Sequence, residues 1–99
     1  MTCPAPTNVQ IFADASSQLV LVSWDYDFPA PSRFDVEVDF LFRGVTFEPI
    51  LHRSAAARQR GLRWESRFIK SGETVRGSVR AMCKSCEESS ASISPELVI

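Results

Sequence analysis

The chain of 99 residues is long enough for one domain with a single hydrophobic core, and its composition excludes a disordered protein. Hydrophobic residues make up 44% of the sequence and charged residues 23%, a balance typical of globular domains. The formal net charge of -1 excludes a global field that would draw the chain to nucleic acid or to an anionic membrane. No apolar run approaches the ~20 residues of a membrane span. We expect residues 1–99 to form a single domain that belongs to a larger protein.

Short segments of alternating apolar and polar residues run through the chain and predict β-strands. In chain order they are TNVQIFA (7–13), QLVLVSW (18–24), RFDVEVDFLF (33–42), VTFEPIL (45–51), LRWESRF (62–68), ETVRGSVRAM (73–82) and SISPELVI (92–99). Turn-forming residues such as Pro29-Ala30-Pro31-Ser32 and Ser71-Gly72 separate them. Residues 53–61 (RSAAARQRG) have a helix-forming composition, but the segment has room for one or two turns at most. Seven short strands, each with one apolar face, predict an all-β sandwich of two sheets.

The order and spacing of these segments resemble a fibronectin type III domain. The resemblance lies in PAPTNVQI followed by LVLVSW, in FDVEVDF after a proline-containing break, in IKSGETVRGSVRA and in the final SISPELVI. It covers essentially the whole chain and implies a seven-stranded immunoglobulin-like β-sandwich of fibronectin type III topology. The sequence departs from the family at Val75, which stands where a tyrosine usually anchors the turn before the sixth strand. We expect Val75 and Ile69 to hold this turn by packing instead.

The resemblance also implies which side chains form the core. The inward residues of the second, third and sixth strands would be Val20, Val22, Trp24, Phe34, Val36, Val38, Phe40, Val75, Val79 and Ala81. Gly77 replaces a usual apolar residue, and we expect it to make room for Trp64. Leu19 and Leu21 would then lie on an outward sheet face, where an exposed apolar patch usually marks a contact with a neighbouring domain or a protein ligand.

Charged residues are unevenly distributed along the chain. In the fibronectin type III arrangement the third and sixth strands are antiparallel neighbours, so their outward acids and bases would face one another: Asp35, Glu37 and Asp39 against Arg76 and Arg80. Arg53 and four further arginines follow in a stretch with few acids, namely Arg58, Arg60, Arg63 and Arg67. If these five arginines converge on one face they would suit an acidic glycan or acidic partner, and otherwise they form an ordinary solvated surface.

The chain has three cysteines, Cys3, Cys83 and Cys86, of which the last two form a Cys-x-x-Cys pair. A strand precedes the pair and no helix follows it, which disfavours redox catalysis. A zinc site would need His52 as its fourth ligand, and the family arrangement places His52 away from the cysteines. The same arrangement places the start of the chain and the loop after the sixth strand at one pole. It therefore implies a disulfide from Cys3 to Cys86, which we prefer because Cys83 would still belong to the strand, or alternatively from Cys3 to Cys83.

The sequence contains no nucleophile elbow, no phosphate-binding glycine loop and a single histidine, so we expect no enzymatic activity, no cofactor and no metal. The resemblance and the cysteines predict an extracellular or cell-surface interaction module of receptor or adhesion type. Its partner would be a protein ligand or a neighbouring domain, with neither nucleic-acid binding nor membrane insertion. Contacts would come from the loop holding Tyr26 and Phe28, from the loop 83–90 or from an outward sheet face. The alternative is a passive spacer domain of a secreted enzyme or surface protein, which would tolerate serine at both aromatic positions.

Overall fold

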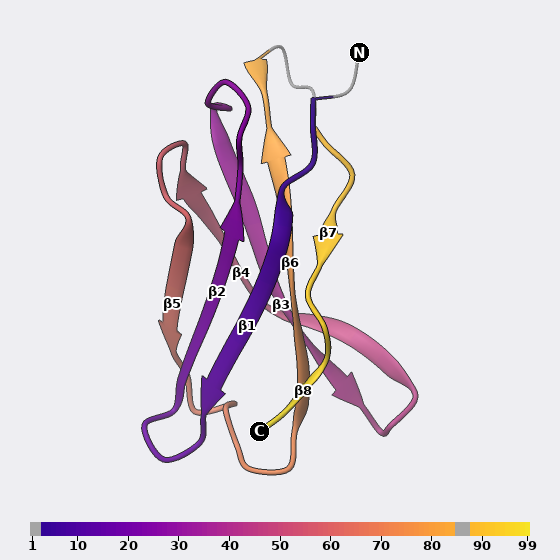
Figure 1. Cartoon of the computed structure of the whole chain (residues 1–99). Coiled ribbons are helices and arrows are strands. Elements are labelled where there is room, and N and C mark those ends of the chain that lie inside the picture. Colours follow the sequence, from indigo (N-terminus) through magenta and orange to yellow (C-terminus); the bar gives the residue numbers. More distant parts are fainter. Residues whose placement is uncertain (1–2, 85–87) are drawn as a thin grey trace.

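Two antiparallel sheets pack face to face in the computed structural model of this chain (Figure 1), which describes residues 3–84 and 88–99. One sheet has the strand order β1-β2-β5, and the other has the order β4-β3-β6-β7, with β8 also paired to β6. The described residues contain these eight strands: β1 (Thr7–Asp14), β2 (Leu19–Asp25), β3 (Arg33–Phe42), β4 (Thr46–Ala56), β5 (Gly61–Glu65), β6 (Thr74–Met82), β7 (Ser92–Ile93) and β8 (Leu97–Val98). The prediction of an all-β sandwich is confirmed.

The predicted last strand is present as two short pieces, β7 and β8. Both run antiparallel to β6, with Ile93 opposite Ser78 and Leu97 opposite Val75. Pro95 lies between the two pieces and has no N–H to donate to β6, which interrupts the ladder. A side chain replaces one of the backbone hydrogen bonds to β6 at this point: the hydroxyl of Ser94 accepts a 2.8 Å hydrogen bond from the backbone N–H of Gly77. Seven predicted strands therefore correspond to eight observed ones.

Strand β4 is longer than the sequence predicted. It continues to Ala56, so residues 53–56 pair with β3 although their composition favours a helix. Pairing with a long neighbouring strand outweighs the weak intrinsic preference of this segment. The register shifts between Val38 and Asp39, which lie opposite Leu51 and Pro49, so Ile50 is an extra residue in a bulge of β4.

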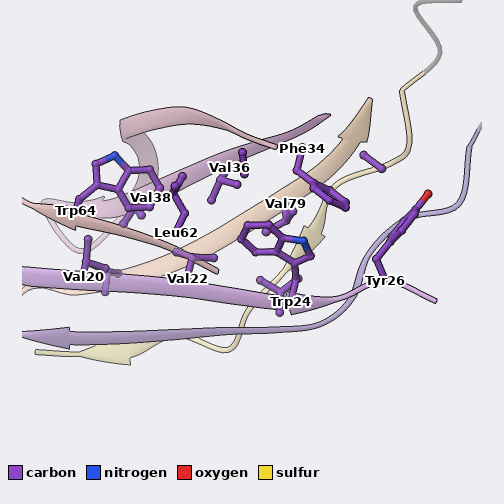
Figure 2. Packing of buried hydrophobic residues seen from close by; sticks show 14 of the residues in the cluster. Val20, Val22, Trp24, Tyr26, Phe34, Val36, Val38, Leu62, Trp64 and Val79 are labelled. Atoms are coloured by element: carbon purple, nitrogen blue, oxygen red, sulfur yellow. The ribbon is translucent and has the colours of Figure 1, made fainter. Parts of the chain in front are cut away.

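The core lies between the sheets and follows the alternation of the sequence (Figure 2). All ten inward side chains implied by the resemblance are buried, which confirms that part of the prediction. Leu62 and Trp64 of β5 complete the β1-β2-β5 side of the core, and Trp24 packs against Phe34 with ring centroids 5.3 Å apart. Val75 and Ile69 are both fully buried, in keeping with a turn held by packing.

Gly77 makes room for a different side chain from the one we expected. A Cβ atom added to Gly77 would lie 3.0 and 3.1 Å from the two methyl carbons of Val22, closer than side chains normally approach. The expectation that Gly77 accommodates Trp64 is therefore wrong. The reason is register: Val22 of the facing sheet points directly at the backbone of β6 at this position.

The charge ladder between β3 and β6 forms in part. The register places Asp39 opposite Arg76 and Asp35 opposite Arg80, and the first pair makes an ion pair of 3.3 Å. Asp35 instead binds Arg33 on its own strand at 3.2 Å, and Arg80 lies 3.8 Å from Glu88. Residues two apart on a strand share a face, which explains why Asp35 can pair with Arg33 in place of Arg80 on the neighbouring strand.

Candidate functional site

A disulfide joins Cys3 to Cys83, whose Cα atoms lie 6.1 Å apart. This is the second of the two pairings implied by the resemblance, and the preference for Cys86 is corrected. Strand β6 ends at Met82, so Cys83 is already outside the ladder and lies beside the N-terminal segment. Cys86 lies outside the described residues. Cys3 and Cys83, two of the four zinc ligands considered with His52, are thus bonded to each other.

Tyr26, which was expected in an exposed loop, is part of the core. Only 6% of the residue is exposed, and its ring stands edge-on to Phe34 with centroids 5.2 Å apart. Its hydroxyl donates a 3.0 Å hydrogen bond to the backbone carbonyl of Pro4. Figure 2 shows the Tyr26 ring at the end of the core, beyond Phe34. Burial raises the pKa of the phenol above its ordinary value, and the nearby positive charge of Arg60 offsets part of that rise.

Arg60, one of the arginines expected to bind a glycan or acidic partner, is half-buried and makes hydrogen bonds within the chain. One terminal nitrogen donates to the carbonyls of Ala57 and Gln59 at 3.0 and 2.8 Å, and the other donates to the carbonyl of Tyr26 at 3.4 Å. The guanidinium also lies 5.4 Å from the centroid of the Phe34 ring. Arg60 therefore fastens the turn between β4 and β5 to the core.

Phe28 is the exposed aromatic residue of the loop between β2 and β3. The residue is 48% exposed, and its ring contacts Tyr26 edge-on with centroids 5.5 Å apart. A hollow of about 440 Å³ opens beside it, lined by Pro4, Tyr26, Phe28, Pro29, Ala30, Pro31, Cys83 and Lys84. We call these lining residues the disulfide-tied pole. Three prolines and the disulfide restrict its backbone, so the shape of the hollow is largely preformed.

The other arginines of the stretch do not converge on one face: Arg53 lies beside Arg63 and donates a 3.5 Å hydrogen bond to its carbonyl, but Arg58 and Arg67 lie apart. Arg58 is exposed in the turn before β5, and Arg63 lies on β5 with its guanidinium 3.8 Å from Glu65. Arg67 follows β5, and its guanidinium lies 5.7 Å from the centroid of the Phe68 ring. Arg58 and Arg67 are thus separated by the full length of β5, five residues at ~3.3 Å each. This arrangement favours the solvated surface over a single anion-binding face.

Leu19 and Leu21 lie on the outward face of the β1-β2-β5 sheet, as expected, with Leu21 exposed and Leu19 half-buried. Sequence reasoning missed their neighbour Phe12, which pairs with Leu21 across β1 and β2 and is 56% exposed. Strand alternation would have predicted this position: Val9, Ile11 and Ala13 point inward, so Phe12 between them points outward.

Among residues 3–84 and 88–99, no helix is long and apolar enough to cross a membrane. In the same described part of the chain, no group of three or more histidine, cysteine or acidic side chains is placed to hold a metal ion.

The strand order and antiparallel pairing define a β-sandwich of the immunoglobulin-like class. No protein-family model matches the sequence, and no curated protein matches it either. Solved structures do match: the third fibronectin III domain of the human KIAA0343 protein has a TM-score of 0.71 and 16% sequence identity, covering 100% of this chain and 82% of that one. A structure described as a myokine has a TM-score of 0.64 and 18% identity, covering 99% and 96% of the two chains. The chain is a fibronectin type III-like domain in fold.

Proposed function

We propose that this chain is a non-catalytic protein-interaction module of the extracellular receptor or adhesion type, and that it binds its partner at the disulfide-tied pole. The observation that carries the proposal is Phe28, a large apolar side chain that is half-exposed and held edge-on against the buried ring of Tyr26. Aromatic anchors beside a pocket supply much of the binding energy in protein interfaces.

The geometry around Phe28 suits a binding surface. The hollow of about 440 Å³ is open to solvent, which suits contact with the surface of a partner protein. Its walls are mostly apolar, with Lys84 supplying a charge at the rim. Since the prolines and the disulfide already restrict the loops, little conformational entropy would be lost when a partner binds.

An extracellular setting is supported by the Cys3–Cys83 disulfide, because such bonds persist in oxidising compartments and are rare in the cytosol. The receptor or adhesion role rests on the fold likeness, since this fold commonly serves as an interaction module.

The proposal is tested by probing an array of secreted proteins and receptor ectodomains with wild type, Phe28→Ser and Phe12→Ser. Phe12 is the matched control, because it is a phenylalanine of similar exposure, 56% against 48% for Phe28, on a different surface. We expect proteins bound by wild type and Phe12→Ser to be lost with Phe28→Ser, by tenfold or more in apparent affinity, about 1.4 kcal/mol or more. Identical binding by all three proteins would show that the partner does not bind at Phe28, and no binding by any of them would favour a passive spacer.

A further inference from the structure

The Cys3–Cys83 disulfide forms part of the wall of the hollow at the disulfide-tied pole. Cys83 lines the hollow, and so does Pro4, the residue that follows Cys3. Both cysteines are half-buried and lie outside the strands, since β1 begins at Thr7 and β6 ends at Met82. Disulfides that solvent can reach are reduced more readily than those sealed in a core. The bond is therefore placed where its reduction would change the shape of the hollow.

The segment of residues 3–5 depends strongly on this bond. Pro4 and Pro6 have no backbone N–H, so the segment cannot extend the ladder of β1 in the regular way. Besides the disulfide, the hydroxyl of Tyr26 holds the segment through its 3.0 Å hydrogen bond to the carbonyl of Pro4. One hydrogen bond contributes about as much free energy as the ordering of one residue costs, so the disulfide is the stronger of these two attachments.

The chain is firmly anchored directly after this segment. Pro6 is fully buried, and its carbonyl accepts a hydrogen bond from the hydroxyl of Ser92. From Thr7 onward β1 pairs with β2. Loss of the disulfide should therefore release residues 3–5 and leave the sandwich in place.

We propose that the Cys3–Cys83 disulfide is a redox-sensitive switch of the disulfide-tied pole, opened by a protein dithiol of the Cys-x-x-Cys class. One thiolate of the dithiol bonds to a sulfur of the pair, so that a mixed disulfide forms and the Cys3–Cys83 bond breaks. The second thiol of the reductant then displaces the chain from the mixed disulfide. The dithiol is thereby oxidised to a disulfide, and its electron pair and both protons end on the sulfurs of Cys3 and Cys83.

Reduction changes the surface around Phe28. The hollow loses its wall at Pro4, and the hydroxyl of Tyr26 loses its acceptor. The ring of Phe28 packs on Tyr26 with centroids 5.5 Å apart, so its position becomes less restrained. The switch rests on the proposed function, because it regulates the surface at which the partner would bind. A less preorganised surface binds more weakly, and we expect the affinity of the reduced form to be lower by about fivefold or more.

Nuclear magnetic resonance of the ¹⁵N-labelled chain, with and without dithiothreitol, tests the switch in the absence of any partner. On reduction we expect the heteronuclear Overhauser effect of the Ala5 amide to fall, which reports release of the segment. Amide shifts should change in residues 26–32, and the remaining dispersion should be retained. Cys3→Ser is the control and should not respond to the reductant. An unchanged Ala5 signal, a global loss of dispersion, or an equal response of Cys3→Ser would overturn the proposal.

Tyr26→Phe separates the hydrogen bond from the disulfide. Without the bond to Pro4, the segment is held less closely beside Cys83. The equilibrium constant for reduction by dithiothreitol should therefore rise about fivefold, the value of one hydrogen bond. An unchanged constant would show that Tyr26 and the disulfide do not act together, contrary to the proposal.

Binding is compared on the array of secreted proteins and receptor ectodomains. The double variant Cys3→Ser with Cys83→Ser stands in for the reduced chain, because a reductant would also reduce the proteins of the array. Cys86→Ser is the matched control and should bind as wild type does. A Phe28-dependent partner that binds the double variant as tightly as wild type would overturn the switch and leave the proposed function intact. If the array yields no such partner, the proposed function fails, and the Ala5 measurement still decides whether reduction opens the pole.

Discussion

The hydroxyl of Tyr26 donates a 3.0 Å hydrogen bond to the carbonyl of Pro4, the residue next to the disulfide-bonded Cys3. The end of β2, the N-terminal segment and the end of β6 are thereby tied together at one pole. The connections are the Tyr26–Pro4 hydrogen bond and the Cys3–Cys83 disulfide. The ring of Phe28 packs edge-on against the Tyr26 ring next to them. The exposed side chain of Phe28 is therefore packed against a part of the molecule whose backbone is restrained.

Tyr26 should titrate above the ordinary tyrosine pKa of about 10, because burial disfavours the phenolate. The pKa is higher in the folded chain than in the unfolded one, so this group's contribution to stability is complete below about pH 10 and is lost as the pH rises further. Tyr26 is the single tyrosine of the chain, which makes the ultraviolet absorbance of tyrosinate specific to it. Titration of the native protein at or below the value found in denaturant would contradict the burial of the phenol.

The Cys3–Cys83 disulfide should contribute about 4 kcal/mol to the free energy of unfolding, since it links residues 80 apart. Cys3→Ser and Cys83→Ser should each lose this amount in denaturant unfolding experiments. Cys86→Ser is the control and should keep both the stability and the cross-link. Peptide mapping by mass spectrometry without reductant should recover residues 3 and 83 in one linked peptide, and a link between residues 3 and 86 would contradict the pairing.

Gly77→Ala should destabilise the domain by ~1–3 kcal/mol, because the added methyl group would press against the methyl carbons of Val22. Val22→Ala removes those methyl groups and leaves a cavity in the core. The double variant should therefore be more stable than the sum of the single changes predicts, by about 1 kcal/mol. Unfolding in urea measures all three, and strict additivity would show that Gly77 and Val22 are not in conflict.

Arg60→Lys should lower the free energy of unfolding by about 1–2 kcal/mol, because an ammonium group cannot reach three carbonyls and the Phe34 ring at once. Arg58→Lys is the matched control in the same turn. Arg58 is exposed, so its replacement should change stability by less than ~0.5 kcal/mol. Equal effects of the two substitutions would show that Arg60 does not fasten the turn.

Most strands were predictable from the sequence, because alternation of apolar and polar residues is a local property. The core positions of β2, β3 and β6 were implied by the resemblance to fibronectin type III domains, and each of the ten is buried. One exception was the end of β4, where residues 53–56 have a helix-forming composition and become a strand only by pairing with β3. That pairing is a long-range contact, and no local pattern reports it.

The candidate site was harder to predict than the fold. Phe28 was identified as exposed, but Tyr26 was not recognised as buried, since its burial requires Pro4 and Phe34 to approach from other parts of the chain. Arg60 looked like a surface charge for the same reason. The cleft lined by Phe42, Ile50 and Phe68 was not predicted at all, because these residues come from three segments that only the topology brings together.

Photo-crosslinking tests the proposed binding pole most directly. A benzoylphenylalanine residue is placed in the hollow as Ala30→benzoylphenylalanine, and in a second protein at the opposite end, in the β1–β2 turn, as Ser16→benzoylphenylalanine (Figure 1). Each is irradiated with every protein that the ectodomain array identifies as a Phe28-dependent partner. We expect cross-links from position 30 and none from position 16. Cross-links from position 16 alone would place the partner elsewhere and contradict binding at the disulfide-tied pole.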